Sequence, residues 1–255
     1  GQGKALSRWW YLVAPALPLL LPQALWVKRT ALRLPDASPP WQGLVPGQTP
    51  STPPLRLLLL GESTVSGVGV DRQADALAGQ LAAQLAAITG RPVQWQALGR
   101  NGADAQACLQ DLLPQVLDQR WDLALLVLGV NDTTHLTSRR QWRTRLACLL
   151  AGLSSCSVQV GVTAVPPLGR FTALPQPLRG WFGLRSGLLD RDLRQVAARQ
   201  HALYLPLDLS FESAYLARDG FHPSAAGYRE WAAGIARQWA PPGAEPSPSS
   251  VEVGT

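Results

Sequence analysis

The residues best suited to chemistry in this 255-residue chain follow an apolar run near residue 60. Four leucines at positions 57–60 end at Gly61, and Glu62 and Ser63 come next. A run of this kind, bounded by turn residues, is typical of a strand buried on both faces. Open α/β sheets bind their ligands at the carboxyl ends of their strands. Ser63 is therefore a candidate nucleophile, although a serine at such a place more often caps a helix.

Three other polar segments lie where the same sheet edge is expected. Arg-Asn-Gly at 100–102 follows a second apolar run, and Gly-Val-Asn-Asp at 129–132 follows a third. Asp-Gly-Phe-His-Pro at 219–223 precedes the last expected helix. Because the carboxyl ends of parallel strands share one edge, we expect these segments to converge on Ser63. Each segment alone is also compatible with an ordinary turn.

Together the segments supply the groups that acyl transfer needs. We expect His222 to take the proton of Ser63, and Asp219 to orient the imidazole. The developing oxyanion needs hydrogen-bond donors placed in advance. The backbone N–H groups of Ser63 and Gly102 and the side-chain amide of Asn131 are the candidates. We expect the neighbouring carboxylates, Glu62 and Asp132, to orient the turns that carry these groups without contacting the substrate.

The segments GEST, RNGAD, GVND and DGFHPSAAGY resemble, in order, the four blocks of the SGNH, or GDSL-type, hydrolase family. Members of that family include esterases, lipases, thioesterases, lysophospholipases and carbohydrate deacetylases. The resemblance covers about residues 55–239. It implies a flavodoxin-like fold, no metal or other cofactor, and a small-molecule or lipid ester as substrate. It also implies the roles given above for Ser63, Gly102, Asn131, Asp219 and His222.

The chain departs from the family pattern in two places. Glu62 stands where the family usually has aspartate, so the carboxylate is carried on a longer arm. The second block is poorer in serine and threonine than is usual, which makes Gly102 a less specific match than Ser63. Two further functions stay open: a catalytically silent module that binds a ligand or partner at this edge, and an acyltransferase that uses the same site.

The elements that position these residues alternate between strand and helix. Apolar runs predict strands at 55–60, 93–98, 122–128, 158–162 and 203–207, and 3.6-residue periodicity predicts helices at 74–88, 103–116, 138–153, 184–200 and 223–239. Successive βα units of this kind call for a parallel sheet with helices on both faces. We therefore predict a three-layer, flavodoxin-like sandwich with a five-stranded parallel sheet.

A long proline-containing segment, 164–182, interrupts this alternation. It carries five large apolar side chains, namely Phe171, Leu174, Leu178, Trp181 and Phe182. Two interpretations stay open: a satellite hydrophobic cluster beneath a loop, or a wall or lid for an acyl group.

The N-terminal part of the chain differs in composition from the rest. Residues 9–27 carry no charge and are flanked by basic residues. This pattern predicts that the N-terminal apolar segment, 1–29, is an uncleaved membrane anchor. The expected location is then the bacterial inner membrane or its periplasmic side. A cleaved signal peptide, giving a secreted or periplasmic protein, and an arm packed on the domain are the alternatives. Residues 30–54 are proline-rich, which predicts a linker. We expect the hydrolase domain at 55–240 and a disordered tail at 241–255.

Charge and cysteine content exclude other classes of protein. The net charge of +6 comes from arginines scattered along the chain without interleaved aromatic residues, so we expect no nucleic-acid partner. Cys108, Cys148 and Cys156 have no regular spacing and predict neither a disulfide framework nor a metal site. We assign no chemical role to His135 or His201.

Overall fold

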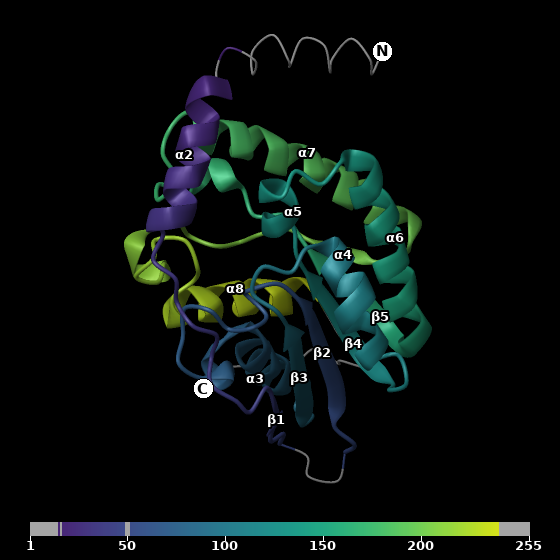
Figure 1. Cartoon of the computed structure of the whole chain (residues 1–255). Coiled ribbons are helices and arrows are strands. Elements are labelled where there is room, and N and C mark those ends of the chain that lie inside the picture. Colours follow the sequence, from purple (N-terminus) through teal and green to yellow (C-terminus); the bar gives the residue numbers. More distant parts are fainter. Residues whose placement is uncertain (1–14, 16, 49–51, 240–255) are drawn as a thin grey trace, which may run out of the picture.

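The protein is built around a twisted sheet with helices on both faces, as Figure 1 shows. The computed structural model describes residues 15, 17–48 and 52–239. In this part of the chain the sheet has six strands in the order β1-β3-β2-β4-β5-β6. Their bounds are Gln42–Val45 for β1, Leu55–Gly61 for β2, Val93–Gly99 for β3, Trp121–Val127 for β4, Ser157–Thr163 for β5 and Leu203–Leu205 for β6.

Five of these strands run parallel, which confirms the predicted fold class. The order β3-β2-β4-β5-β6 is the 2-1-3-4-5 order of flavodoxin-like sheets. The sixth strand, β1, pairs antiparallel with β3 at the edge and lies within the segment 30–54 that we expected to be a linker. Its four residues, Gln-Gly-Leu-Val, alternate between exposed and partly buried. A short edge strand of this kind has too weak an alternation to stand out from the prolines around it.

Two layers of helices cover the two faces of the sheet. The helices are α2 (Leu17–Thr30), α3 (Leu77–Thr89), α4 (Ala105–Ala107), α5 (Val130–Thr134), α6 (Arg139–Cys156), α7 (Leu178–Arg199) and α8 (Ala225–Gln238). Successive residues of a strand point to opposite faces. Accordingly, Leu57 and Leu59 pack in the core beneath α3 and α8, whereas Leu58 and Leu60 pack in the core beneath α6 and α7. β2 is therefore held rigidly from both sides, and the turn that follows it is fixed in place.

Three helical elements differ from the sequence expectation. The helix expected at 103–116 is a short α4 followed by a π-helical turn and a 3-10 turn that contains Pro114, because proline cannot donate the next helical hydrogen bond. The helix α5 was not expected, since it has only five residues. The helix α7 begins at Leu178, six residues earlier than expected, and takes up the end of the long apolar segment.

The predicted membrane location is wrong, and the described residues do not support the anchor at 9–27 from which it was derived. Across the residues that the structure describes, no helix has both the length and the apolar character that a bilayer crossing requires. The described part of the segment forms α2, which has 14 residues where a span needs about 20. Leu20 of α2 is buried against the domain, and Gln23 exchanges hydrogen bonds with Gln176 and Leu178. Residues 9–14 and 16 lie outside the described residues, as does the tail at 241–255.

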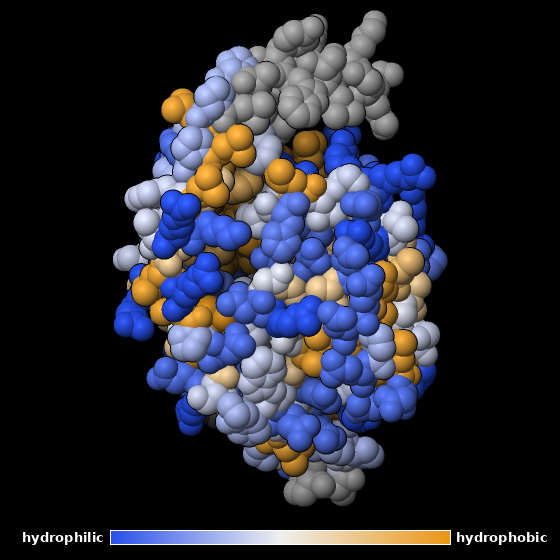
Figure 2. Space-filling view, viewed as in Figure 1, coloured by the Kyte–Doolittle hydropathy of each residue, from blue (hydrophilic) through white to orange (hydrophobic). Residues whose placement is uncertain are grey.

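The described apolar residues of α2 divide between the domain and the surface. Leu20 packs inward with a third apolar cluster, whereas Leu19, Leu21, Leu25 and Trp26 stay more than half exposed. Figure 2 shows hydrophobic side chains on this helix and around the hollow beneath it. The charge-free composition that predicted a span therefore reflects, in part, the packing of this arm.

Candidate active site

Ser63 lies in the tight turn that follows β2, at the carboxyl edge of the sheet. Its hydroxyl oxygen is 2.9 Å from Nε2 of His222, and its side chain is largely buried. The turn begins at Gly61, where an added Cβ would lie 1.8 Å from the carbonyl oxygen of Val127. Only glycine lets β2 and β4 approach so closely at this level. Within the described chain, the hydroxyl of Ser63 thus pairs with a histidine and does not cap a helix.

His222 and Asp219 come from the loop before α8. Nδ1 of His222 lies 2.5 Å from Oδ2 of Asp219. The other carboxylate oxygen, Oδ1, accepts hydrogen bonds from the backbone N–H groups of Phe221 and His222 at 2.9 and 3.0 Å. With Nδ1 donating to the carboxylate, Nε2 is the lone-pair nitrogen that faces Ser63. The structure therefore brings together the three residues that the sequence proposed for proton transfer.

The surroundings of Asp219 keep its carboxyl group ionised. Burial alone raises its pKa, but the hydrogen bond with His222 and those from the backbone N–H groups of Phe221 and His222 outweigh burial and lower the pKa below its ordinary value. Gly220 adopts a φ of +67°, a conformation that glycine takes without strain. This turn places the aspartate and the histidine three residues apart on one side of the loop, so a single short segment carries both groups.

The three candidate oxyanion donors differ in whether their hydrogens already have acceptors. Asn131 lies at the start of α5, and its Nδ2 donates to Oε2 of Glu62 at 3.2 Å and to the carbonyl oxygen of Ala103 at 3.0 Å. Both hydrogens of that amide therefore already have acceptors. By contrast, the backbone N–H groups of Ser63 and Gly102 donate to no other group in the described ranges. Gly102 is exposed with a φ of +84°, and nothing lies within 4 Å of a Cβ added there.

Glu62 is almost fully buried and ties the turn after β2 to the start of α5. Its carboxylate accepts the backbone N–H groups of Val130 and Asn131, each at 3.3 Å, besides the side-chain amide of Asn131. Burial raises its pKa to about 8, with the N–H groups of Asn131 and Val130 opposing the rise. The glutamate thus lies behind the nucleophile and holds Asn131, as expected for a supporting residue.

Asp132 is fully buried and joins two of the predicted segments. It accepts hydrogen bonds from the backbone N–H of Ala105 and the hydroxyl of Thr137, both at 2.8 Å. Its pKa is raised, chiefly by burial. A residue that the sequence gave no role, Arg185 of α7, donates to the carbonyl oxygens of Asp132, Thr133 and Thr137. No local pattern marks this arginine, because its partners lie about fifty residues away.

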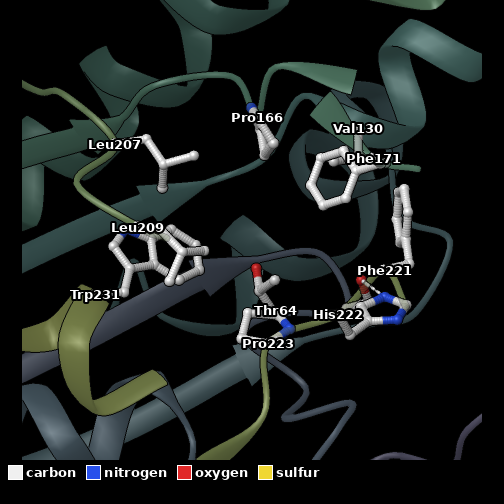
Figure 3. A pocket seen from close by; sticks show the side chains of 11 residues that line it. Thr64, Val130, Pro166, Phe171, Leu207, Leu209, Phe221, His222, Pro223 and Trp231 are labelled. Atoms are coloured by element: carbon white, nitrogen blue, oxygen red, sulfur yellow. Dashed lines mark hydrogen bonds between the residues drawn. The ribbon is translucent and has the colours of Figure 1, made fainter. Parts of the chain in front are cut away.

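A mostly apolar pocket opens beside Ser63 and His222 (Figure 3). Besides those two, it is lined by Thr64, Val130, Pro166, Phe171, Leu207, Leu209, Phe221, Pro223 and Trp231. In Figure 3, Leu207, Leu209 and Trp231 gather at the end away from His222, and the rings of Phe171 and Phe221 lie near the histidine. Sequence reasoning did not find the far end, which comes from the segment after β6 and from α8.

Side chains of the long apolar segment, 164–182, form a satellite cluster, and one of them also lines the pocket. Phe171, Leu174, Leu178 and Phe182 form a buried cluster with Leu20 and Leu168. Phe171 also lines the pocket, with its ring centroid 4.6 Å from that of Phe221. The cluster is therefore both a satellite core and the backing of one pocket wall.

His135 lies outside this arrangement. Its Nδ1 is 3.2 Å from Asp104 on a half-exposed surface, and it does not line the pocket.

Known proteins share the fold and the sequence blocks of this chain. A search of curated proteins finds a GDSL-like esterase, Rv1075c of Mycobacterium tuberculosis, that is 31% identical over 185 residues. The match covers 68% of this chain and 58% of that protein, so the chain spans under two thirds of its relative. Among solved structures, the lipase/acylhydrolase of Enterococcus faecalis matches with a TM-score of 0.58 at 22% identity, over 72% of this chain and 94% of that one.

An acetylxylan esterase of Geobacillus stearothermophilus shares the fold with a TM-score of 0.54 at 16% identity, over 72% of this chain and 93% of that one. At such identities these structures show the fold alone. The family model for GDSL-like lipases and acylhydrolases matches residues 59–230, a stretch that holds Ser63, Asp219 and His222. This chain therefore belongs to the GDSL-like lipase/acylhydrolase family.

Proposed function

We propose that this chain hydrolyses carboxylic esters through an acyl-enzyme intermediate on Ser63. The observation that carries the proposal is the unbroken hydrogen-bonded series from Ser63 through His222 to Asp219. A serine hydroxyl is a weak nucleophile until a base takes its proton, and an imidazole oriented by a carboxylate is such a base near neutral pH.

The reaction begins when Oγ of Ser63 attacks the ester carbonyl carbon and gives its proton to Nε2 of His222. The carbonyl oxygen becomes an oxyanion, which the free backbone N–H groups of Ser63 and Gly102 stabilise. Collapse of this intermediate breaks the bond to the alcohol, which leaves with the proton from His222. The product of this half-reaction is an acyl ester of Ser63 and the free alcohol.

Water completes the cycle by the same route. His222 takes a proton from the water as its oxygen attacks the acyl carbonyl carbon. The second tetrahedral intermediate then breaks its bond to Oγ of Ser63, which recovers the proton from His222. The carboxylic acid leaves and the enzyme returns to its starting state. Asp219, whose lowered pKa keeps it ionised, stabilises the imidazolium in both halves.

The shape of the pocket supports a short acyl group over a long lipid chain. The cavity volume of this partly open pocket is about 30 Å³, whereas a cavity that holds a benzene ring measures roughly 150 Å³. Leu207, Leu209 and Trp231 close the end away from His222. We infer small-molecule esters with short acyl chains as the substrates, a class that includes acetylated compounds such as the one that the Geobacillus relative is named for.

Hydrolysis of p-nitrophenyl acetate tests this function. We expect turnover by the wild-type chain and a loss of at least about a thousandfold in Ser63→Ala. The control is Ser154→Ala, since Ser154 is an exposed serine of α6 and its removal should leave the rate unchanged. Equal rates in wild type and Ser63→Ala would exclude the proposal.

A further inference from the structure

Two residues that line the apolar pocket each carry a polar atom without a hydrogen-bond partner among the described residues. The hydroxyl of Thr64 and the indole N–H of Trp231 are both buried, and neither forms a hydrogen bond within the part of the chain that the structure describes. Thr64 is 9% exposed and Trp231 is 2% exposed. Leaving a buried donor unpaired costs folding free energy, so two such groups beside one pocket need an explanation.

Both residues line the pocket that opens at Ser63. Thr64 directly follows the nucleophile in sequence, and in Figure 3 its hydroxyl oxygen points into the space between Leu209 and Phe171. Trp231 lies at the end of the pocket away from His222. An acyl group bound through Ser63 would therefore pass the threonine hydroxyl first and meet the indole beyond it.

The chemistry of the two groups defines what they can bind. An indole N–H only donates, and a threonine hydroxyl can donate or accept. Both can therefore donate to an oxygen atom on the acyl chain. His222 is the one ionisable side chain among the eleven residues that line the pocket, and no lysine or arginine is among them. A buried carboxylate would have no cation beside it, which is costly, so the oxygen belongs to a neutral group.

We propose that this pocket is a subsite for short acyl groups that carry a neutral oxygen, a hydroxyl or keto oxygen close to the ester carbonyl, recognised by Thr64 and Trp231. This inference rests on the proposed ester hydrolysis and names its substrate class. A plain hydrocarbon chain would leave both donors unpaired in the complex, whereas a hydroxyacyl or ketoacyl chain would pair them.

The test compares ethyl butyrate with ethyl β-hydroxybutyrate and ethyl acetoacetate, which have the same carbon chain with an oxygen on the β-carbon. We expect kcat/KM for the oxygen-bearing esters to exceed that for butyrate by about tenfold in the wild type. Thr64→Val and Trp231→Phe should each bring this ratio towards one, whereas Thr64→Ser, which keeps a hydroxyl, should preserve it. Comparing ratios between variants cancels the different intrinsic reactivities of the esters.

Thr163 provides a matched control, because its buried hydroxyl also lacks a partner in the described chain but does not line the pocket. Thr163→Val should leave the ratio unchanged. A wild-type ratio of one, a ratio kept in both Thr64→Val and Trp231→Phe, or the same loss in Thr163→Val would overturn the subsite. If Trp231→Phe does not fold, the comparison of Thr64→Val with Thr64→Ser decides whether the subsite exists.

A binding measurement separates this inference from the proposed reaction. In Ser63→Ala, we expect calorimetry to show that ethyl β-hydroxybutyrate binds about tenfold more tightly than ethyl butyrate, and that Thr64→Val in this background removes the difference. Equal affinities would contradict the subsite. Failure of every ester to turn over, with the affinity difference intact, would instead refute the hydrolase and leave the subsite standing.

Discussion

Glu62 is predicted to make the stability of the fold depend on pH. Its carboxyl group is 1% exposed, and burial raises its pKa from 4.5 to about 8. The folded state therefore binds the proton more tightly than the unfolded state does. The contribution of Glu62 to the free energy of unfolding should be fully present below pH 4.5, fall as the pH rises from there through about 8, and then level off.

The size of this effect follows from the shift. The rise from 4.5 to about 8, at about 1.4 kcal/mol per pH unit, corresponds to a loss on the order of 5 kcal/mol when Glu62 is fully ionised. Solvent screening reduces it little, because the group is buried. Glu62→Gln keeps the shape of the side chain and does not titrate. Its one carbonyl oxygen can replace the carboxylate oxygen that accepts from Asn131, while the acceptor for the N–H of Val130 is lost.

Urea unfolding at about pH 5 and about pH 9 measures the prediction. The free energy of unfolding of the wild type should fall more steeply between these values than that of Glu62→Gln, by several kcal/mol. Glu212→Gln is the control, since Glu212 is exposed and its removal should leave the wild-type slope. A Glu62→Gln variant with the same pH dependence as wild type would refute the reasoning.

Three further substitutions test other parts of the account. Asp219→Asn leaves the shape intact but removes the charge opposite His222, so the rate of ester hydrolysis should fall about ten-thousandfold; retention of a tenth of the rate would contradict that role. Gly61→Ala forces a Cβ against the carbonyl oxygen of Val127 and should lower the free energy of unfolding, measured in urea, by about 3 kcal/mol or more. A loss under about 1 kcal/mol would count against the close approach. Asp132→Ala leaves two buried donors without their acceptor and should cost roughly 2–5 kcal/mol, which thermal and urea unfolding will show; an unchanged midpoint would exclude the buried link.

The strands and the meeting of Ser63, His222 and Asp219 could be predicted because their signals are local. The leucines of β2 form a run long enough to identify a strand buried on both faces, and parallel strands share a carboxyl edge. The spacing of Asp219 and His222 lets one loop carry both. These features do not depend on which distant residues pack against them, so the sequence alone sufficed.

The parts that sequence reasoning missed depend on distant contacts. The strand β1 exists because β3 has a free edge next to it, not because its own four residues favour a strand. The described part of the supposed anchor packs against the long apolar segment, and composition alone does not separate such an arm from a membrane span. The far end of the pocket joins Leu207, Leu209 and Trp231, which no spacing connects.

Glu62 shows the same limit within a motif that was recognised. The sequence marked it as a departure from aspartate, but only the fold shows where the longer side chain reaches. Its carboxylate holds the amide of Asn131, so among the three proposed oxyanion donors the backbone N–H groups of Ser63 and Gly102 are the unengaged ones in the described chain. The expected role of Asn131 as a direct donor thus stays a prediction that depends on this hydrogen bond breaking when substrate binds.

The most direct test of the central claim is labelling with a fluorophosphonate, followed by intact-protein and peptide mass spectrometry. Such a probe reacts with a serine whose hydroxyl an adjacent base activates. We predict one adduct per chain, on Ser63, which is absent in Ser63→Ala and strongly reduced in His222→Ala. Folded wild-type protein that takes up no probe, or an adduct that persists in Ser63→Ala, would contradict the account.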